Sequence, residues 1–123
     1  METKKVFVYG TLRQGWGLNR YIQDCGGVLL ETTKLKGYKM YSLGGYPAIN
    51  QTTSEDSVVG EVYEFPKDQV DTAFNIMDRI ELGAGYRRDR VKVGKHDVYT
   101  YVYERGLEGS RPSMIDWTKE ARR

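Results

Sequence analysis

One amphipathic segment near the middle of the chain constrains the fold more than any other feature. Between Pro66 and Gly83, apolar side chains recur at the i, i+3, i+4, i+7 spacing of one helix face, at Val70, Ala73, Phe74, Met77 and Ile80. This spacing predicts a helix over residues 68–80. Proline is favoured at the start of a helix and glycine just past its end, so both flanks agree with the prediction.

The other periodic segments favour β-structure. Residues 98–104 alternate strictly between two sets of side chains, as a half-buried strand does. The 10 tyrosines and 14 glycines of the chain suit half-buried strands joined by tight turns. We expect strands at 4–9, 28–33, 38–43, 58–65, 86–93 and 98–104, an irregular edge segment at 46–49, and a short helix at 18–24. The expected fold is a mostly antiparallel sheet or barrel with one long helix.

Length and charge limit the function classes. The 123 residues are expected to form a single domain, with 109–123 as a mobile tail or a short helix near 114–120. Lys and Arg number 19 against 17 Asp and Glu, a balance that argues against nucleic acid or a membrane surface as a partner. A lone Cys25 permits no intramolecular disulfide, and the apolar run before Gly10 is too short for a signal peptide. A cytoplasmic protein is expected.

Few residues suited to metal or nucleophilic chemistry are present. With one histidine and one cysteine, the chain lacks the usual ligands of a zinc site, and no metal or cofactor is expected. His96 falls in an expected hairpin loop at 94–97, where we predict an exposed, non-functional side chain. A Cys25–His96 pair could act as nucleophile and base, but an unreactive, partly buried thiol is commoner.

The first candidate site follows the N-terminal strand, at Tyr9, Gly10, Thr11 and Leu12, hereafter the 9–12 turn. Backbone N–H groups after a strand that ends on glycine can converge on one point and bind a carboxylate or an oxyanion. A plain turn without a ligand has the same spacing, and the spacing alone favours that alternative.

The second candidate is Glu81, which lies four residues after Met77 and therefore on or beside the buried stripe of the predicted helix. Asp78 points more toward the flank of that helix. Burial would raise the pKa of Glu81 toward neutrality, as a general acid–base requires. The alternative is a glutamate at the solvent border, or one paired with Arg87 or Arg88.

An ordered set of segments resembles the γ-glutamylcyclotransferase-like family, including its γ-glutamylamine cyclotransferase, AIG2-like branch. The segments are VFVYGTLRQG at 6–15, YPAI at 46–49, VGEVY at 59–63, Asp78-x-x-Glu81 with YRRDRVKV at 86–93, and the strand at 98–103. The resemblance implies an α+β fold, a small, mostly antiparallel β-barrel flanked by one long helix and short helices. Residues 82–85 and those after Gly106 depart from the family pattern.

The resemblance also implies a reaction. The free α-amine of a γ-glutamyl group attacks its own γ-amide carbonyl, which releases an amine and 5-oxoproline without a metal or cofactor. It implies Glu81 as the catalytic carboxylate, the 9–12 turn as the substrate-binding loop, and Tyr46 and Tyr86 as cavity-lining residues. Two alternatives stay open: a non-catalytic relative that binds a γ-glutamyl-like ligand or a protein partner, and, as a poorer third, a nucleic-acid-binding protein.

Overall fold

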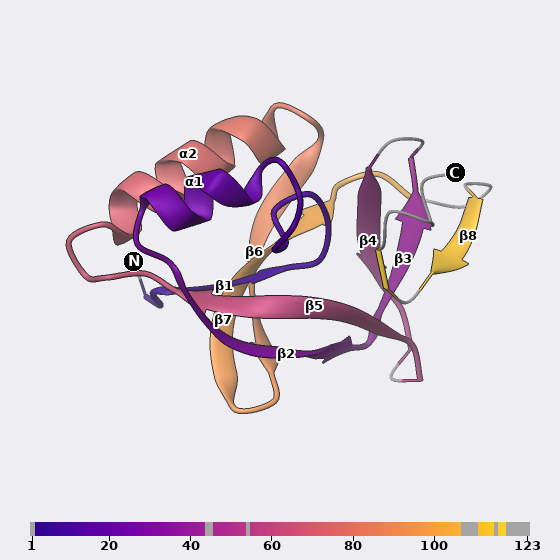
Figure 1. Cartoon of the computed structure of the whole chain (residues 1–123). Coiled ribbons are helices and arrows are strands. Elements are labelled where there is room, and N and C mark those ends of the chain that lie inside the picture. The colour runs from indigo at the N-terminus through magenta and orange to yellow at the C-terminus, as the bar shows by residue number, and fades with distance from the viewer. Residues whose placement is uncertain (1, 44–45, 54, 107–110, 115, 118–123) are drawn as a thin grey trace.

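The computed structural model describes residues 2–43, 46–53, 55–106, 111–114 and 116–117, which form an α+β fold (Figure 1). The helices are α1 Asn19–Asp24 and α2 Val70–Leu82. The strands are β1 Lys5–Val8, β2 Val28–Lys36, β3 Tyr38–Ser42, β4 Pro47–Gln51, β5 Ser57–Glu64, β6 Tyr86–Val93, β7 His96–Tyr103 and β8 Arg111–Met114. Every strand expected from the sequence is therefore confirmed, and so is the short helix at 18–24.

The strands form a five-stranded sheet, ordered β2-β5-β1-β7-β6, and a three-stranded sheet, ordered β4-β3-β8. Neighbouring strands pair antiparallel except β1 and β7, which pair in parallel at Val6 and Tyr99 and make the larger sheet mixed. The expected closed barrel is not observed among the described strands.

Gly37 separates the two sheets. Its φ of 84° lies in the left-handed region, which glycine adopts without a steric penalty. The Gly37 N–H donates to Asp56 O at 2.8 Å, and Gly37 O accepts from Thr52 N–H at 2.7 Å. The chain therefore leaves the larger sheet at the end of β2 and enters the smaller one at β3, which is one reason that the strands do not continue into a single barrel wall.

Both helices cover the same face of the larger sheet (Figure 1). Helix α2 begins two residues later than the sequence predicted, at Val70, and ends at Leu82, directly before Gly83. Its predicted apolar stripe is largely buried, and the Phe74 ring packs edge-on against Tyr99 at 5.1 Å between centroids. The later end of the helix places Glu81 inside the last turn.

The C-terminal prediction is wrong where the structure tests it. Arg111–Met114 forms strand β8, which pairs with β3 and aligns Met114 with Met40, so no helix begins at Met114. The pairing partner on β3 is distant in sequence, which is why local helix-forming preferences misled the prediction. Residues 115 and 118–120 of the expected helix lie outside the described residues, as do 109–110 and 121–123 of the expected tail.

The prediction of an exposed His96 is also wrong. Val93 pairs with His96 across β6 and β7, so the hairpin loop consists of Gly94 and Lys95 alone, and His96 belongs to the sheet. Its side chain is buried, with Nε2 at 3.0 Å from Glu31 Oε2 and Nδ1 at 3.2 Å from Lys5 Nζ. Both ring nitrogens are thus engaged, and the Cys25–His96 pair is not formed. Burial raises the pKa of the Cys25 thiol, which disfavours a reactive thiolate.

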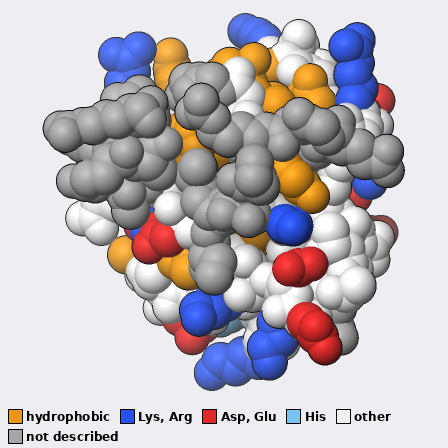
Figure 2. Space-filling model, turned by 90° about the vertical axis from the view of Figure 1, so that its right-hand side faces the viewer, with side chains coloured by type: hydrophobic (Ala, Val, Ile, Leu, Met, Phe, Trp, Pro, Cys, Tyr) orange, Lys and Arg blue, Asp and Glu red, His pale blue; other side chains and the backbone are white. Residues whose placement is uncertain are grey.

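Within the described part of the chain, no helix is long and apolar enough to cross a membrane. The same residues contain no group of three or more His, Cys, Asp or Glu side chains placed to hold a metal ion. Figure 2 shows basic and acidic side chains interspersed on the face that it presents. That distribution gives no support to a dedicated nucleic-acid surface on this face.

Candidate active site

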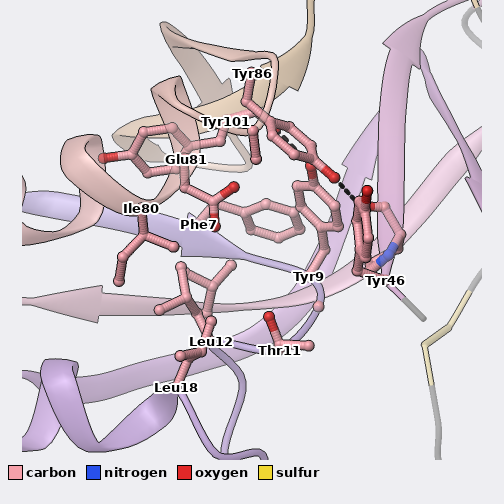
Figure 3. A pocket seen from close by; sticks show the side chains of 14 residues that line it. Phe7, Tyr9, Thr11, Leu12, Leu18, Tyr46, Ile80, Glu81, Tyr86 and Tyr101 are labelled. Carbon is pink, nitrogen blue, oxygen red and sulfur yellow. Dashed lines mark hydrogen bonds between the residues drawn. The ribbon is translucent and has the colours of Figure 1, made fainter. Parts of the chain in front are cut away.

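A cavity of about 410 Å³ lies where the end of β1, the 9–12 turn, the C-terminal end of α2, and strands β6 and β7 meet (Figure 3). Every site residue predicted from the sequence lines it: Tyr9, Gly10, Thr11, Leu12, Tyr46, Glu81 and Tyr86. The other lining residues are Phe7, Val8, Leu18, Pro47, Ile80, Ala84 and Tyr101. Segments far apart in the sequence are therefore brought to one hollow of the size of a small-molecule site.

Glu81 projects from the last turn of α2 toward the middle of this cavity (Figure 3). Its carboxylate forms no hydrogen bond or ion pair with any described residue. Arg87 instead pairs with Asp89 at 3.1 Å, and Arg88 pairs with Asp78 at 2.9 Å. The alternative in which Glu81 is paired with one of these arginines is therefore wrong.

The surroundings of Glu81 favour its neutral form. Burial raises the pKa of Glu81 from 4.5 to about 7, because the apolar walls replace water that would solvate the charge. Since no cation offsets this desolvation among the described residues, the carboxyl group titrates near neutral pH. Such a group can both accept and return a proton.

The 9–12 turn places backbone groups opposite α2. Arg13 N–H donates to Gly10 O at 2.9 Å and closes the turn. Within the described part of the chain, the N–H groups of Gly10, Thr11 and Leu12 donate to no protein acceptor. A Cβ atom on Gly10 would lie 2.6 Å from Pro47 Cγ, so only glycine permits this close approach of the turn to β4.

Two buried polar residues that the sequence reasoning missed hold this turn in place. Asn19, at the start of α1, donates through Nδ2 to Leu12 O at 2.8 Å. Glu61, on β5, accepts from Gln14 N–H at 2.8 Å and from the Tyr63 hydroxyl at 3.0 Å. A buried polar side chain requires hydrogen-bonding partners. The VGEVY segment, where a glutamate interrupts an otherwise apolar strand, therefore already indicated a buried carboxylate with such partners.

Two phenols of the cavity, those of Tyr9 and Tyr86, donate their protons to backbone carbonyls. Tyr9 donates to Tyr101 O, and Tyr86 donates to Pro47 O, each at 2.6 Å. Burial, with the nearby Glu81 charge, raises the pKa of both phenols. They stay protonated around neutral pH, which leaves Glu81 as the cavity group that changes charge there. Tyr46 is 45% exposed and lies at the mouth.

Tyr101 is a further wall residue that the sequence reasoning did not single out. Its hydroxyl donates to Asp78 Oδ1 at 2.7 Å, while Arg88 Nη1 donates to Asp78 Oδ2 at 2.9 Å. Asp78 thus lies on the flank of α2, as expected, and ties the helix to β6 and β7 beside Glu81.

Known protein sequences resemble this chain over most of its length. The sequence model of the family described as "Gamma-glutamyl cyclotransferase, AIG2-like" matches residues 6–119. The chain belongs to this family. A "Putative gamma-glutamylcyclotransferase" of Vibrio cholerae is 32% identical over 99 residues, which cover 80% of this chain and 81% of that protein. The family protein YtfP of Escherichia coli K12 is 29% identical over 105 residues, 85% of this chain and 87% of that one.

Solved structures of other proteins share the fold of this family member. An uncharacterized protein from Pyrococcus horikoshii superposes with a TM-score of 0.76 and 26% identity, covering 95% of this chain and 92% of that one. An AIG2-like protein from mouse gives a TM-score of 0.71 at 16% identity, covering 96% and 90% respectively. At such low identity, the mouse protein supports the fold alone.

Proposed function

We propose that this protein is a γ-glutamylcyclotransferase that converts a γ-glutamyl-amine or γ-glutamyl amide to 5-oxoproline and a free amine, with Glu81 as the general acid–base. The observation that carries the proposal is the Glu81 carboxyl group, which lies in the cavity with a pKa raised to about 7 and without a protein partner among the described residues. Family membership supports the reaction class.

The reaction needs two proton transfers, and one carboxyl group can perform both. In the first step the substrate α-amine nitrogen bonds to the γ-carbonyl carbon, and Glu81 takes the proton that this nitrogen loses. In the second step the bond from that carbon to the leaving nitrogen breaks, and Glu81 returns the proton to the leaving amine. The protein ends in its starting state, and no oxidant or reductant is consumed.

The 9–12 turn supplies the complementary charge. Gly10, Thr11 and Leu12 line the cavity, and their N–H groups have no protein acceptor within the described residues. We assign them to the glutamyl α-carboxylate or to the oxyanion that forms on the γ-carbonyl. Such backbone donors are fixed before the substrate arrives, so they need little reorganisation in the transition state.

The cavity walls favour the folded conformation that ring closure requires. The side chains of Tyr9 and Tyr86 are fixed by their hydrogen bonds to backbone carbonyls, and Tyr46 covers the mouth. Rigid walls that hold the α-amine against the γ-carbonyl make the attack effectively unimolecular. No metal or cofactor takes part in this scheme. A cytoplasmic location is part of the proposal, because the single cysteine suits a reducing compartment.

A turnover assay alongside calorimetry tests the proposal against a protein that only binds its ligand. Purified protein is incubated with γ-glutamyl amines, γ-glutamyl dipeptides and glutathione, and 5-oxoproline is quantified. Heat of binding is measured with 5-oxoproline and the same compounds. Release of 5-oxoproline supports the enzyme, whereas binding without product supports the non-catalytic alternative.

A further inference from the structure

The cavity has two chemically different halves on either side of Glu81. Figure 3 shows Leu12, Leu18 and Ile80 on one side of the carboxylate and Tyr9, Tyr46 and Tyr86 on the other. The first group presents only hydrocarbon. The second contributes phenol oxygens, which can still accept hydrogen bonds after donating their protons to the backbone.

Charge in the cavity is as uneven as polarity. Glu81 carries the one ionisable charge at neutral pH among the described residues that line it. The cations on neighbouring segments are engaged elsewhere: Arg88 pairs with Asp78 at 2.9 Å, and Arg13 pairs with Glu61 at 3.5 Å and with Asp116. Within this part of the chain, a second carboxylate on the substrate would thus find no counter-ion. It would also be repelled by Glu81 in a poorly solvated space.

The polar and the apolar parts of the substrate are expected to bind in different halves of the cavity. The glutamyl group carries a carboxylate and an amine, so it suits the half with the phenols and the free N–H groups of the 9–12 turn. Ring closure draws the amine and the γ-carbonyl together beside Glu81. The leaving nitrogen then projects toward the remaining half, where Leu12, Leu18 and Ile80 lie.

We propose that the leaving group is a neutral, apolar amine of alkylamine type, bound in a subsite formed by Leu12, Leu18 and Ile80. The inference rests on the proposed cyclotransferase function and specifies its substrate class. Each methylene of the alkyl chain that moves from water onto this hydrocarbon surface stabilises the complex further. From the area involved, we expect kcat/KM to rise about fourfold per methylene until the subsite is filled.

A matched series of substrates separates polarity from chain length. The γ-glutamyl amides of n-butylamine, γ-aminobutyrate and putrescine carry similar chains that end in a methyl, a carboxylate and an ammonium group. We expect kcat/KM for 5-oxoproline release from the butylamide to exceed that of either charged amide by roughly tenfold or more, since a charge must be desolvated. Equal or faster release from the carboxylate amide, or from the ammonium amide, overturns the proposal.

A variant of the subsite supplies a second test. Leu18→Ala removes part of the hydrocarbon wall, so it is expected to lower kcat/KM for the butylamide by roughly fourfold or more and to change that of the methylamide little. Leu29→Ala, on exposed β2, is the control and should affect neither. An equal loss on both amides would indicate a structural role for Leu18 and contradict the subsite.

Failure of the inference and failure of the proposed function give different results. If none of the amides yields 5-oxoproline, the cyclotransferase assignment is wrong and the subsite falls with it. If the charged amides yield it as readily as the butylamide, the enzyme assignment stands and only the apolar leaving group is wrong.

Discussion

The Tyr101 hydroxyl donates a 2.7 Å hydrogen bond to Asp78, which lies one helical turn before Glu81 on α2. Arg88 binds the other carboxylate oxygen of Asp78, and its guanidinium lies 4.7 Å from the centroid of the Tyr99 ring. The positive charge of Arg88 is thereby paired with Asp78 rather than with Glu81. Asp78 thus holds Arg88 and Tyr101 together on the flank of α2 beside Glu81.

The Asp78→Asn variant is expected to lower the pKa of Glu81. It removes a negative charge one turn away and leaves Arg88 uncompensated, and both changes favour an ionised Glu81. The acidic limb of kcat/KM for 5-oxoproline release should move to lower pH by roughly 0.5 to 1 pH unit. Asp71→Asn, an equal charge change at an exposed site on the same helix, is the control. Coincident profiles for both variants and the wild type would exclude this role of Asp78.

Glu81 should also destabilise the folded protein at neutral pH. Its carboxyl pKa is about 7 when folded and 4.5 ordinarily, so between these values the folded protein holds a proton that the unfolded chain has released. Stability therefore falls as pH rises through this window. The difference between the two pKa values corresponds to about 3 kcal/mol of unfolding free energy. Partial exposure of the side chain reduces this to about 2 kcal/mol.

The Glu81→Gln variant removes this titration. In urea unfolding its free energy of unfolding should exceed that of the wild type by about 2 kcal/mol at about pH 8 and match it below about pH 4. A stability difference that is the same at both pH values would show that Glu81 has an ordinary pKa.

Gly10 is predicted to be intolerant of a side chain. In Gly10→Ala the new Cβ would lie 2.6 Å from Pro47 Cγ and 2.9 Å from Cδ, and a proline ring cannot rotate away. We expect a loss of about 1–3 kcal/mol of unfolding free energy, and reduced turnover because the 9–12 turn shifts. Gly17→Ala is the control, because nothing lies within 4 Å of its Cβ. Equal stability of the two variants would contradict the close approach seen here.

Asn19 is predicted to act on substrate binding through the backbone. In Asn19→Ala, Leu12 O loses its 2.8 Å hydrogen bond, so the 9–12 turn becomes less well fixed. We expect about 1–3 kcal/mol less stability and, well below the unfolding temperature, a several-fold higher KM with a smaller change in kcat. A fall in kcat alone would argue against an effect on substrate binding.

The sequence predicted what depends on local periodicity. The apolar spacing that ends at Ile80 located α2 within two residues, and the position of Glu81 after Met77 correctly indicated a partly buried carboxyl group. The 9–12 turn was placed by Gly10, which follows the strand expected at 4–9. Each of these follows from rules that act over a few residues.

The remaining features depend on strand register, which local rules do not determine. His96 was expected in a loop and is buried, because the hairpin turn is shorter than its composition suggested. The contact of Tyr101 with Asp78, and that of Glu61 with Gln14, join residues that only the completed sheet brings together. The roles of Glu81, the 9–12 turn, Tyr46 and Tyr86 in catalysis and binding stay predictions.

The most direct test of the account is the rate of 5-oxoproline release by Glu81→Gln, with circular dichroism to verify folding and Glu55→Gln, at an exposed loop position, as the control. Loss of the proton-transferring group should reduce kcat by roughly a hundredfold or more, while Glu55→Gln keeps the wild-type rate. A folded Glu81→Gln protein that forms 5-oxoproline at a near wild-type rate would contradict the central role of Glu81.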